Sequence, residues 1–293
     1  MKRTAFIAIV GRPNVGKSTL LNAILKEKIA IVSKKPQTTR NRITGIDTTA
    51  DDQFVFLDTP GIHKPRTRLG DYMVNTANNA IGEADAAILV VEPRGEVGEI
   101  ESKIIAGLKS RGMHAILVIN KTDASTALQI AKTIEAYSAL YNFDAVVPTS
   151  AKNNKGIEAV VDECRQYLQE SVWFFPEDEI TDQPERQIAA EIIREKLLRV
   201  LSDEIPHGTA VVIEEFSEGD KLLRIRAEIF CERSSHKGII IGKNGVTLKQ
   251  IGTYAREDME NFFGIKVFLD LWVKVKENWR DSTVNLSNFG YKE

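Results

Sequence analysis

The sequence predicts two domains: an α/β domain with a mostly parallel sheet and helices on both faces, then a smaller α+β domain. Three observations support this prediction. Short β-branched runs alternate with amphipathic stretches up to about residue 170. The residue pattern then changes at an acidic segment that contains prolines, and the later strands alternate apolar with polar residues. A chain of 293 residues is long enough to bury two cores.

The strands expected in the first domain are apolar on both faces, as in a sheet that helices cover on both sides. They are "AFIAIV" (5–10), "FVFLD" (54–58), "AAILVVE" (86–92), "AILVIN" (115–120) and "AVVPTS" (145–150). Amphipathic helices are expected at 99–111, 125–141 and 157–169. Open sheets of this kind bind ligands at the carboxyl ends of their strands, so we expect the site there.

The first domain is placed at residues 1–170, an acidic linker at 171–185 and the second domain at 186–293. Between residues 176 and 186 there are five acidic residues, one basic residue and two prolines, which indicates a solvated linker whose aromatic residues 173–175 pack one of its ends. An acidic arm that contacts a partner is the alternative. The second domain is expected to contain a helix (186–202), strands at 209–216 and 222–230, a glycine-rich loop, a helix (245–262) and a strand (265–275).

Composition excludes several protein classes. The 39 Lys and Arg residues nearly balance the 41 Asp and Glu residues, so any basic surface must be local. Cys164 and Cys231 fall in a predicted helix and a predicted strand, which indicates a reducing compartment rather than a disulfide framework. Apolar runs such as 86–91 are far shorter than the roughly 20 residues of a membrane span. A strand begins within five residues of the start, so we expect no signal peptide and a cytoplasmic location.

The segment "GRPNVGKST" (11–19) matches the phosphate-binding pattern G-x-x-x-x-G-K-[ST] and lies between a predicted strand and a predicted helix. In this context the glycines let backbone N–H groups and the helix N-terminus face phosphates. Lys17 is expected to contact the β- and γ-phosphates, and the Ser18 hydroxyl to bind Mg²⁺. The nucleotide contacts expected from this loop are Gly11, Asn14, Val15, Gly16, Lys17, Ser18 and Thr19.

Three further motifs end predicted strands of the same sheet: "DTPG" (58–61), "NKTD" (120–123) and "TSAK" (149–152). Asp58 is expected to reach Mg²⁺ through a water, and the Gly61 N–H to meet the γ-phosphate. An Asp123 carboxylate accepts hydrogen bonds from N1–H and the amine of guanine, whereas adenine offers a lone pair at N1 and no such amine. The sequence therefore predicts a guanine nucleotide. The contacts expected from the last two motifs are Asn120, Lys121, Asp123, Ser150, Ala151 and Lys152.

This motif set resembles the translation-factor-related class of GTPases. The resemblance implies that "PQTTRNRITGI" (36–46) is the first switch and that Thr39, rather than Thr38, closes on Mg²⁺ and the γ-phosphate. The metal ligands expected are thus Ser18, Thr39 and Asp58, and the residues expected to serve catalysis are Lys17, Thr39, Gly61 and Asn14.

Ile62 follows DTPG, where Ras-like enzymes place a glutamine that orients the attacking water. An isoleucine cannot hold a water, so hydrolysis must use another group. In related GTPases that have an apolar residue after DTPG, the residue at the position of Asn14 helps to hold K⁺. His63 as a base is a second alternative. Slow intrinsic turnover is expected.

A second glycine-rich segment, "GIIIGKNG" (238–245), fails the phosphate-binding pattern because its spacing is short and Asn244 has no hydroxyl. Its last four residues read G-x-x-G before a helix, which is how KH domains clamp single-stranded nucleic acid. Residues 221–256 contain eight basic and two acidic residues, and the element order is that of a type II KH fold. The alternative is an ordinary turn on a charged surface. The RNA contacts expected are Lys237, Gly238, Ile241, Gly242, Lys243, Asn244, Gly245 and Lys249, with the apolar residues 239–241 meeting the bases.

Over essentially the whole chain, these motifs together with "EIIREKLLRVLSDEIPHGTAVVIEEF" resemble the Era family of bacterial GTPases. The resemblance implies a P-loop GTPase domain followed by a type II KH domain. It also implies a monomeric protein that binds GTP and GDP, recognises the 3′ end of 16S rRNA and acts in assembly of the 30S ribosomal subunit. The resemblance further implies a peripheral association with the inner membrane, although no amphipathic anchor is evident in the sequence.

Two other functions compete with this GTP-controlled RNA binder. One is an RNA chaperone whose nucleotide domain is a relic, against which the intact motifs argue. The other is a membrane-associated GTPase of cell-cycle signalling, whose basic region meets lipid rather than RNA.

Overall fold

The computed structural model describes residues 1–202 and 204–292, and these form two compact units. The first unit comprises Met1–Pro65 and Gly70–Asp182, and the second comprises Arg66–Leu69 and Gln183–Glu293. Within the described residues, no helix has the length and apolar character needed to cross a membrane.

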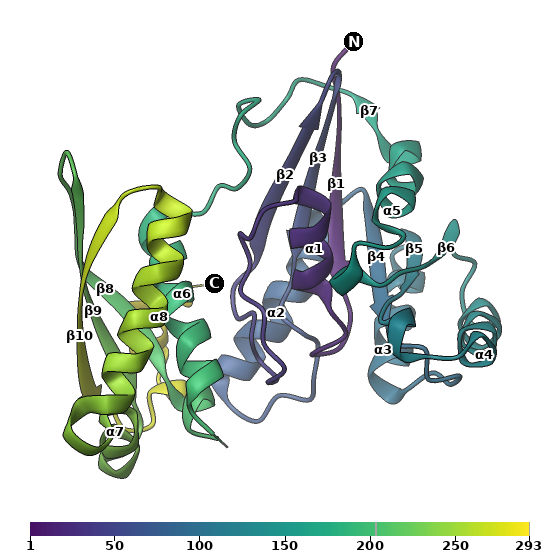
Figure 1. The fold of residues 1–293 in the computed structure, drawn as a ribbon. Coiled ribbons are helices and arrows are strands. Elements are labelled where there is room, and N and C mark those ends of the chain that lie inside the picture. The colour runs from purple at the N-terminus through teal and green to yellow at the C-terminus, as the bar shows by residue number, and fades with distance from the viewer. Residues whose placement is uncertain (203, 293) are drawn as a thin grey trace. The chain divides into compact units, whose positions relative to one another are not determined.

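The first unit is built on a sheet of order β2-β3-β1-β4-β5-β6 (Figure 1). Its strands are β1 (Arg3–Val10), β2 (Ile43–Thr49), β3 (Asp52–Asp58), β4 (Ala86–Val91), β5 (His114–Ile119) and β6 (Ala145–Pro148), with β7 (Gln169–Glu170) pairing antiparallel with β1. β2 is antiparallel to β3, and the other neighbours on this path are parallel. The mostly parallel sheet that the sequence predicts is confirmed. The edge strand β2 was not predicted.

Helices cover both faces of this sheet (Figure 1). They are α1 (Lys17–Leu25), α2 (Arg68–Glu83), α3 (Glu99–Ser110), α4 (Ala127–Ser138) and α5 (Ile157–Cys164). α1 and α5 pack into one core with one face of the strands, while α2, α3 and α4 contribute to the core on the opposite face. The predicted helix at 157–169 ends early, because a 3-10 turn and β7 follow α5. α2 was not predicted.

The segment that follows α5 and β7 lies along the first unit as far as Ile180. The Gln53 side chain bonds the backbone of Phe174 and Phe175, and the Phe174 ring packs edge-on against Phe6. Further along, the Ile180 carbonyl accepts a hydrogen bond of 2.9 Å from the Ile46 N–H. The expected packing of one end by aromatic residues is present, and the contact with β2 extends it.

The second unit has a sheet of order β10-β9-β8, in which β8 and β9 are antiparallel and β9 and β10 are parallel. Its elements are α6 (Glu185–Val200), β8 (Ala210–Glu218), β9 (Leu222–Cys231), α7 (Ser234–Ile241), α8 (Val246–Phe263), β10 (Lys266–Val275) and α9 (Thr283–Asn288). α6, α7 and α8 share one core with the strands. The predicted α+β fold of KH type is confirmed.

One expectation in this unit was wrong. Residues Gly238–Ile241 were read as part of a loop, but they form the last turn of α7, and Ile240 is fully buried. Ile240 therefore cannot meet the bases of a bound strand. Ile239, half exposed on the same helix, remains accessible. Burial of the apolar face of α7 outweighs the low helix propensity of glycine and β-branched residues.

Candidate nucleotide site and nucleic-acid interface

The loop between β1 and α1 has a backbone that favours glycine. Gly11, Asn14 and Gly16 have φ angles of 152°, 65° and 103°. A Cβ on Gly16 would lie 2.2 Å from Asn120 Nδ2, and one on Gly11 would lie 2.5 Å from the Val90 carbonyl oxygen. α1 then begins at Lys17, with Thr19 in its first turn. The loop is thus curled tightly at the N-terminus of a helix, the arrangement that binds phosphates.

The Lys17 side chain is buried inside this loop. Its Nζ donates to the carbonyl oxygens of Gly11 and Arg12 at 3.3 and 3.2 Å. Burial lowers the pKa of Lys17 to about 8, against the opposing charge of Asp58. A positive group is therefore held at the centre of the loop.

The three expected metal ligands lie together. Ser18 Oγ lies 2.8 Å from Thr39 Oγ1 and donates a hydrogen bond of 2.5 Å to Asp58 Oδ2. The other carboxylate oxygen, Oδ1, is buried and has no hydrogen-bond partner among the described residues. Burial raises the pKa of Asp58 to about 6, although Lys17 opposes the shift. Two hydroxyls and a buried carboxylate form an oxygen set that Mg²⁺ prefers.

The segment after β3 is fixed close to the phosphate-binding loop. A Cβ on Gly61 would lie 2.6 Å from Pro13 Cα, and the Ile62 N–H donates to the Gly11 carbonyl at 3.1 Å. The Ile62 side chain packs on the apolar core, consistent with a residue that orients no water. His63, the alternative candidate for a base, is half-buried. Its Nδ1 lies 2.9 Å from the Gly61 carbonyl oxygen, and its Nε2 is buried without a partner among the described residues.

Asn14, the candidate K⁺ residue, is exposed. Its Nδ2 donates a hydrogen bond of 2.9 Å to the Lys34 carbonyl. The side chain therefore links the phosphate-binding loop to the segment that precedes Thr39.

The two expected base-binding loops meet beyond β5 and β6. Asn120 Nδ2 donates to the Val15 carbonyl at 2.9 Å, and its Oδ1 accepts from the Ala151 N–H at 3.0 Å, so one buried amide ties three loops together. Asp123 is exposed, and its Oδ1 accepts a 2.6 Å hydrogen bond from the Ser150 hydroxyl. That bond lowers the pKa of Asp123 and orients its carboxylate. Lys152 lies close by, exposed in a 3-10 turn.

Sequence reasoning missed a carboxylate next to this site. Glu92 follows β4 and pairs with Arg12 and Lys121, so it contacts both the phosphate-binding loop and the NKTD segment. The signal was available, because Glu92 ends the apolar run 86–91 at the same sheet edge as the four motifs.

The second candidate site lies in the second unit, where Gly242–Gly245 form the turn between α7 and α8. Gly242, Asn244 and Gly245 have φ angles of 76°, 53° and 77°. A Cβ on Gly242 would lie 2.2 Å from Thr247 Oγ1, so a side chain there is excluded. Lys243 and Asn244 are exposed at the turn, while Lys237 is partly buried on the preceding helix and Gly238 is exposed there.

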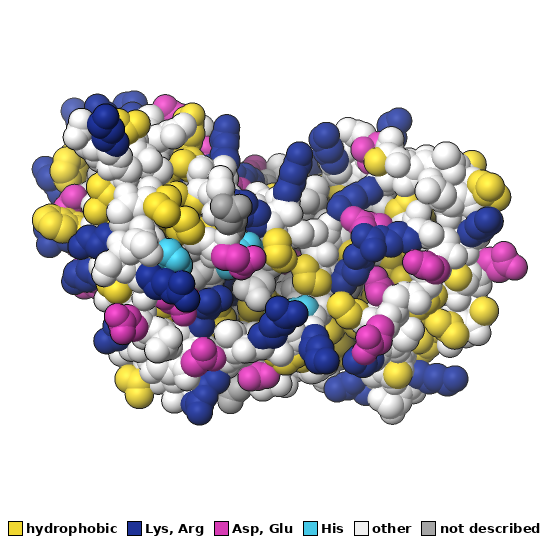
Figure 2. Space-filling view, turned by 90° about the horizontal axis from the view of Figure 1, so that it is seen from below, with side chains coloured by type: hydrophobic (Ala, Val, Ile, Leu, Met, Phe, Trp, Pro, Cys, Tyr) yellow, Lys and Arg dark blue, Asp and Glu magenta, His cyan; other side chains and the backbone are white. Residues whose placement is uncertain are grey.

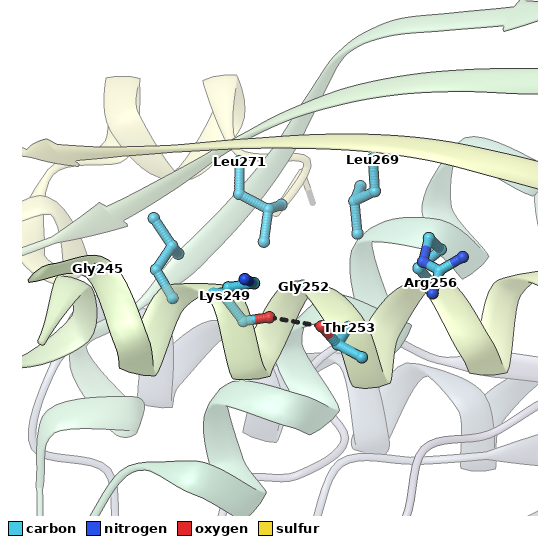
Figure 3. A pocket seen from close by; sticks show the side chains of 8 residues that line it. Gly245, Lys249, Gly252, Thr253, Arg256, Leu269 and Leu271 are labelled. Carbon is cyan, nitrogen blue, oxygen red and sulfur yellow. Dashed lines mark hydrogen bonds between the residues drawn. The ribbon is translucent and has the colours of Figure 1, made fainter.

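A groove runs from this turn between α8 and β10 (Figure 3). Leu269 and Leu271 point from β10 toward α8, which presents Lys249, Thr253 and Arg256. Arg256 pairs with Glu260 at 3.3 Å, whereas no ion pair of Lys243 or Lys249 is present among the described residues. On the face that Figure 2 shows, many Lys and Arg side chains lie at the surface among acidic and apolar ones. An apolar floor with free cations at its rim suits a single strand of nucleic acid.

Two family models match this chain, one in each unit. A family model described as 50S ribosome-binding GTPase matches residues 6–121, and a KH domain model matches residues 204–280. GTPase Era of Ruminiclostridium cellulolyticum is 49% identical over 99% of this chain and 98% of its own length. GTPase Era of Clostridium kluyveri is 48% identical over the full length of both chains. The chain belongs to the Era family of GTPases. It is accordingly an enzyme that hydrolyses GTP.

Solved structures of Era-family proteins have the same fold over the same length. An Aquifex aeolicus Era variant bound to GDP and AlF₄⁻ superposes with a TM-score of 0.95 at 38% identity and covers 99% of this chain and 100% of its own. Era in complex with MgGDPNP and nucleotides 1506–1542 of 16S ribosomal RNA superposes with a TM-score of 0.96 at 38% identity, over the whole of both chains.

Proposed function

We propose that this Era-family GTPase binds GTP with Mg²⁺, hydrolyses it slowly, and uses the nucleotide state to control binding of an unpaired 3′ segment of 16S rRNA during 30S subunit assembly. The observation that carries the proposal is the presence in one chain of a guanine-nucleotide constellation and of a cation-rimmed groove beside a G-x-x-G turn. The likeness to an Era complex that contains both MgGDPNP and 16S rRNA supports it. No observation on the described residues favours a membrane ligand over RNA.

Each residue of the nucleotide site has a proposed role in GTP binding or hydrolysis. Ser18 and Thr39 would bind Mg²⁺ directly and Asp58 through a water, and the ion would neutralise charge on the β- and γ-phosphates. Lys17 contributes a second positive charge, and the Gly61 N–H donates to the γ-phosphate. Asp123 selects guanine. With Ile62 packed on the core, Asn14 is our candidate for holding a K⁺ ion that assists hydrolysis.

In the second unit the turn residues Gly242–Gly245 would clamp the RNA backbone, with Lys243 and Lys249 pairing with phosphates. Lys237, Gly238 and Ile241 on α7 would border the same strand. The bases would lie over the leucines on the floor of the groove.

The first prediction tests the coupling of the two sites. We expect the full chain to bind a single-stranded RNA of the 16S 3′ end at least several-fold more tightly with a GTP analogue than with GDP. The same RNA should raise the affinity for the GTP analogue relative to the affinity for GDP by the same factor, because coupling free energies are reciprocal. Fluorescence anisotropy of labelled RNA at fixed salt measures the first factor, and nucleotide titration with and without RNA measures the second.

Two matched variants distinguish RNA contacts in the groove from a general effect of protein charge on RNA binding. Lys243→Glu should weaken RNA binding and reduce its salt dependence by about one unit of slope, since a phosphate contact is lost. Lys221→Glu makes the same charge change on an exposed residue outside the groove and should have a much smaller effect. RNA affinity that is equal with GTP analogue, GDP and no nucleotide would disprove the switch. Anionic vesicles that displace RNA at the same salt would favour the membrane function instead.

A second prediction follows from the buried lysine. With a pKa of about 8 in the free loop, Lys17 loses its proton as pH rises through 8, whereas phosphates next to it favour the charged form. GDP binding should therefore take up a proton at pH 8.5, and the uptake should fall as the pH is lowered toward 7. Calorimetry in buffers of different ionisation enthalpy measures the uptake. Lys17→Arg stays charged throughout and should abolish it, so uptake that survives this change would contradict the assignment.

A further inference from the structure

Glu92 is a carboxylate on which three basic side chains converge. It lies directly after β4, and only 19% of its side chain is exposed. One oxygen, Oε1, accepts a 2.5 Å hydrogen bond from Lys121 Nζ, and the other, Oε2, accepts from Arg94 at 2.9 Å and from Arg12. Burial opposes ionisation, but the hydrogen bond and charge of Lys121 and the charge of Arg12 hold the pKa of Glu92 below its ordinary value. The group is a carboxylate at neutral pH.

Lys121 is the partner that connects Glu92 to the nucleotide site. Its Nζ also donates a 2.6 Å hydrogen bond to the Asn14 carbonyl, in the phosphate-binding loop. Its backbone has a φ of 65°, which L-residues rarely adopt, and it stands two residues before Asp123. A flexible four-carbon side chain is thus fixed at two points, one on the loop for the phosphates and one on Glu92.

We propose that Glu92 is a positioning residue for guanine nucleotide. Through Lys121 it holds the NKTD segment, which carries Asp123, against the phosphate-binding loop, so that the base and the phosphates are gripped by one rigid unit. This inference rests on the proposed guanine-nucleotide site. Without the negative charge at residue 92, Lys121 would keep only neutral oxygen acceptors, the two loops would separate more easily, and bound nucleotide would leave faster.

Simple electrostatics predicts the opposite direction. Removing a negative charge near three cations makes the site more positive, which should strengthen the binding of phosphates and slow nucleotide release. That effect should also be larger for a triphosphate than for a diphosphate. If Glu92 positions the loops, its loss instead accelerates release of both nucleotides by a similar factor. The direction of the change and its dependence on the number of phosphates therefore distinguish positioning from simple electrostatics.

Glu101 provides a matched control. It lies in the first turn of α3, is more buried than Glu92, and pairs with Arg12 at 2.9 Å, but no contact with Lys121 is present among the described residues. Glu101→Gln therefore makes the same change of charge at Arg12 without touching the link to the NKTD segment.

The experiment measures release of a fluorescent GDP and of a fluorescent GTP analogue from the full-length protein in Mg²⁺. Glu92→Gln should release both about tenfold faster than the unmodified chain, the size expected when a hydrogen bond between charged groups loses the charge on its acceptor. Glu101→Gln should stay within about twofold. Lys121→Met should also accelerate release, and the double variant Glu92→Gln/Lys121→Met should be no faster than the faster single one, because both changes break one link.

Three results would overturn the inference: unchanged or slower release from Glu92→Gln, equal effects of Glu92→Gln and Glu101→Gln, or additive effects of Glu92→Gln and Lys121→Met. If Glu92→Gln does not fold, Glu92→Asp keeps the charge but withdraws the carboxylate, and it must release GDP faster for the inference to stand. An unmodified chain that binds no GDP would instead disprove the proposed nucleotide site itself.

Discussion

Replacing Asp123 with Asn should reverse the base preference of the protein from guanine to xanthine. The Ser150 hydroxyl donates to Asp123 Oδ1 at 2.6 Å, so in Asp123→Asn the amide oxygen takes that place and Nδ2 faces the base. Nδ2 can only donate, and it meets another donor in the amine of guanine but an acceptor in the oxygen of xanthine. We expect GDP affinity to fall by about 10⁴-fold, the scale of a mismatched buried hydrogen bond, while xanthosine diphosphate gains affinity.

Competition titrations of both nucleotides against a fluorescent analogue measure this change. Ser150→Ala is the matched control, because it removes the hydrogen bond that orients Asp123 but leaves the carboxylate. It should weaken GDP binding by about tenfold and create no preference for xanthine. An Asn variant that still prefers GDP would show that Asp123 does not read the base.

The elements that could be predicted are those with a simple local signal. β1, β4 and β5 each contain an uninterrupted apolar run, and the motifs that follow strands were found because polar residues begin where an apolar run ends. The spacing of Leu69, Met73, Ala77 and Ile81 would have indicated α2, but the segment was left unassigned. β2 is an edge strand rich in Thr, and its Gly45 packs so closely against α1 that a Cβ would lie 2.6 Å from Leu21. That constraint is tertiary and leaves no local pattern.

The candidate sites show the same division. The order of the four motifs predicted that Ser18 and Asp58 approach each other, because carboxyl ends of neighbouring strands meet at one edge. The direction of individual side chains was not predictable. The His63 side chain turns inward, and Leu248 packs against the core of its unit and also lines the groove beside Lys249. Such directions depend on which neighbours leave space, and a single sequence does not contain that information.

Lys17→Ala is a second change with a large expected effect on the enzyme. The ammonium is buried, it is held by two carbonyl oxygens of its own loop, and its charge opposes the burial penalty on Asp58. Losing it removes positive charge where the β- and γ-phosphates lie and raises further the pKa of a carboxyl that must be ionised to serve Mg²⁺. We expect kcat/KM for GTP to fall by at least about 10³-fold, measured as phosphate release at saturating Mg²⁺.

The same variant decides between a switch and a relic, because Lys17 lies in the first unit and the KH groove in the second. Lys17→Ala should bind the RNA with an affinity that no longer responds to GTP analogue or GDP. Lys121→Met, which acts through the Asn14 carbonyl and Glu92, should instead weaken nucleotide binding while RNA affinity still responds once nucleotide is saturating. If cells that carry only the Lys17→Ala protein assembled small ribosomal subunits at the normal rate, the nucleotide domain would be dispensable, and a plain RNA chaperone would be the better description of this chain.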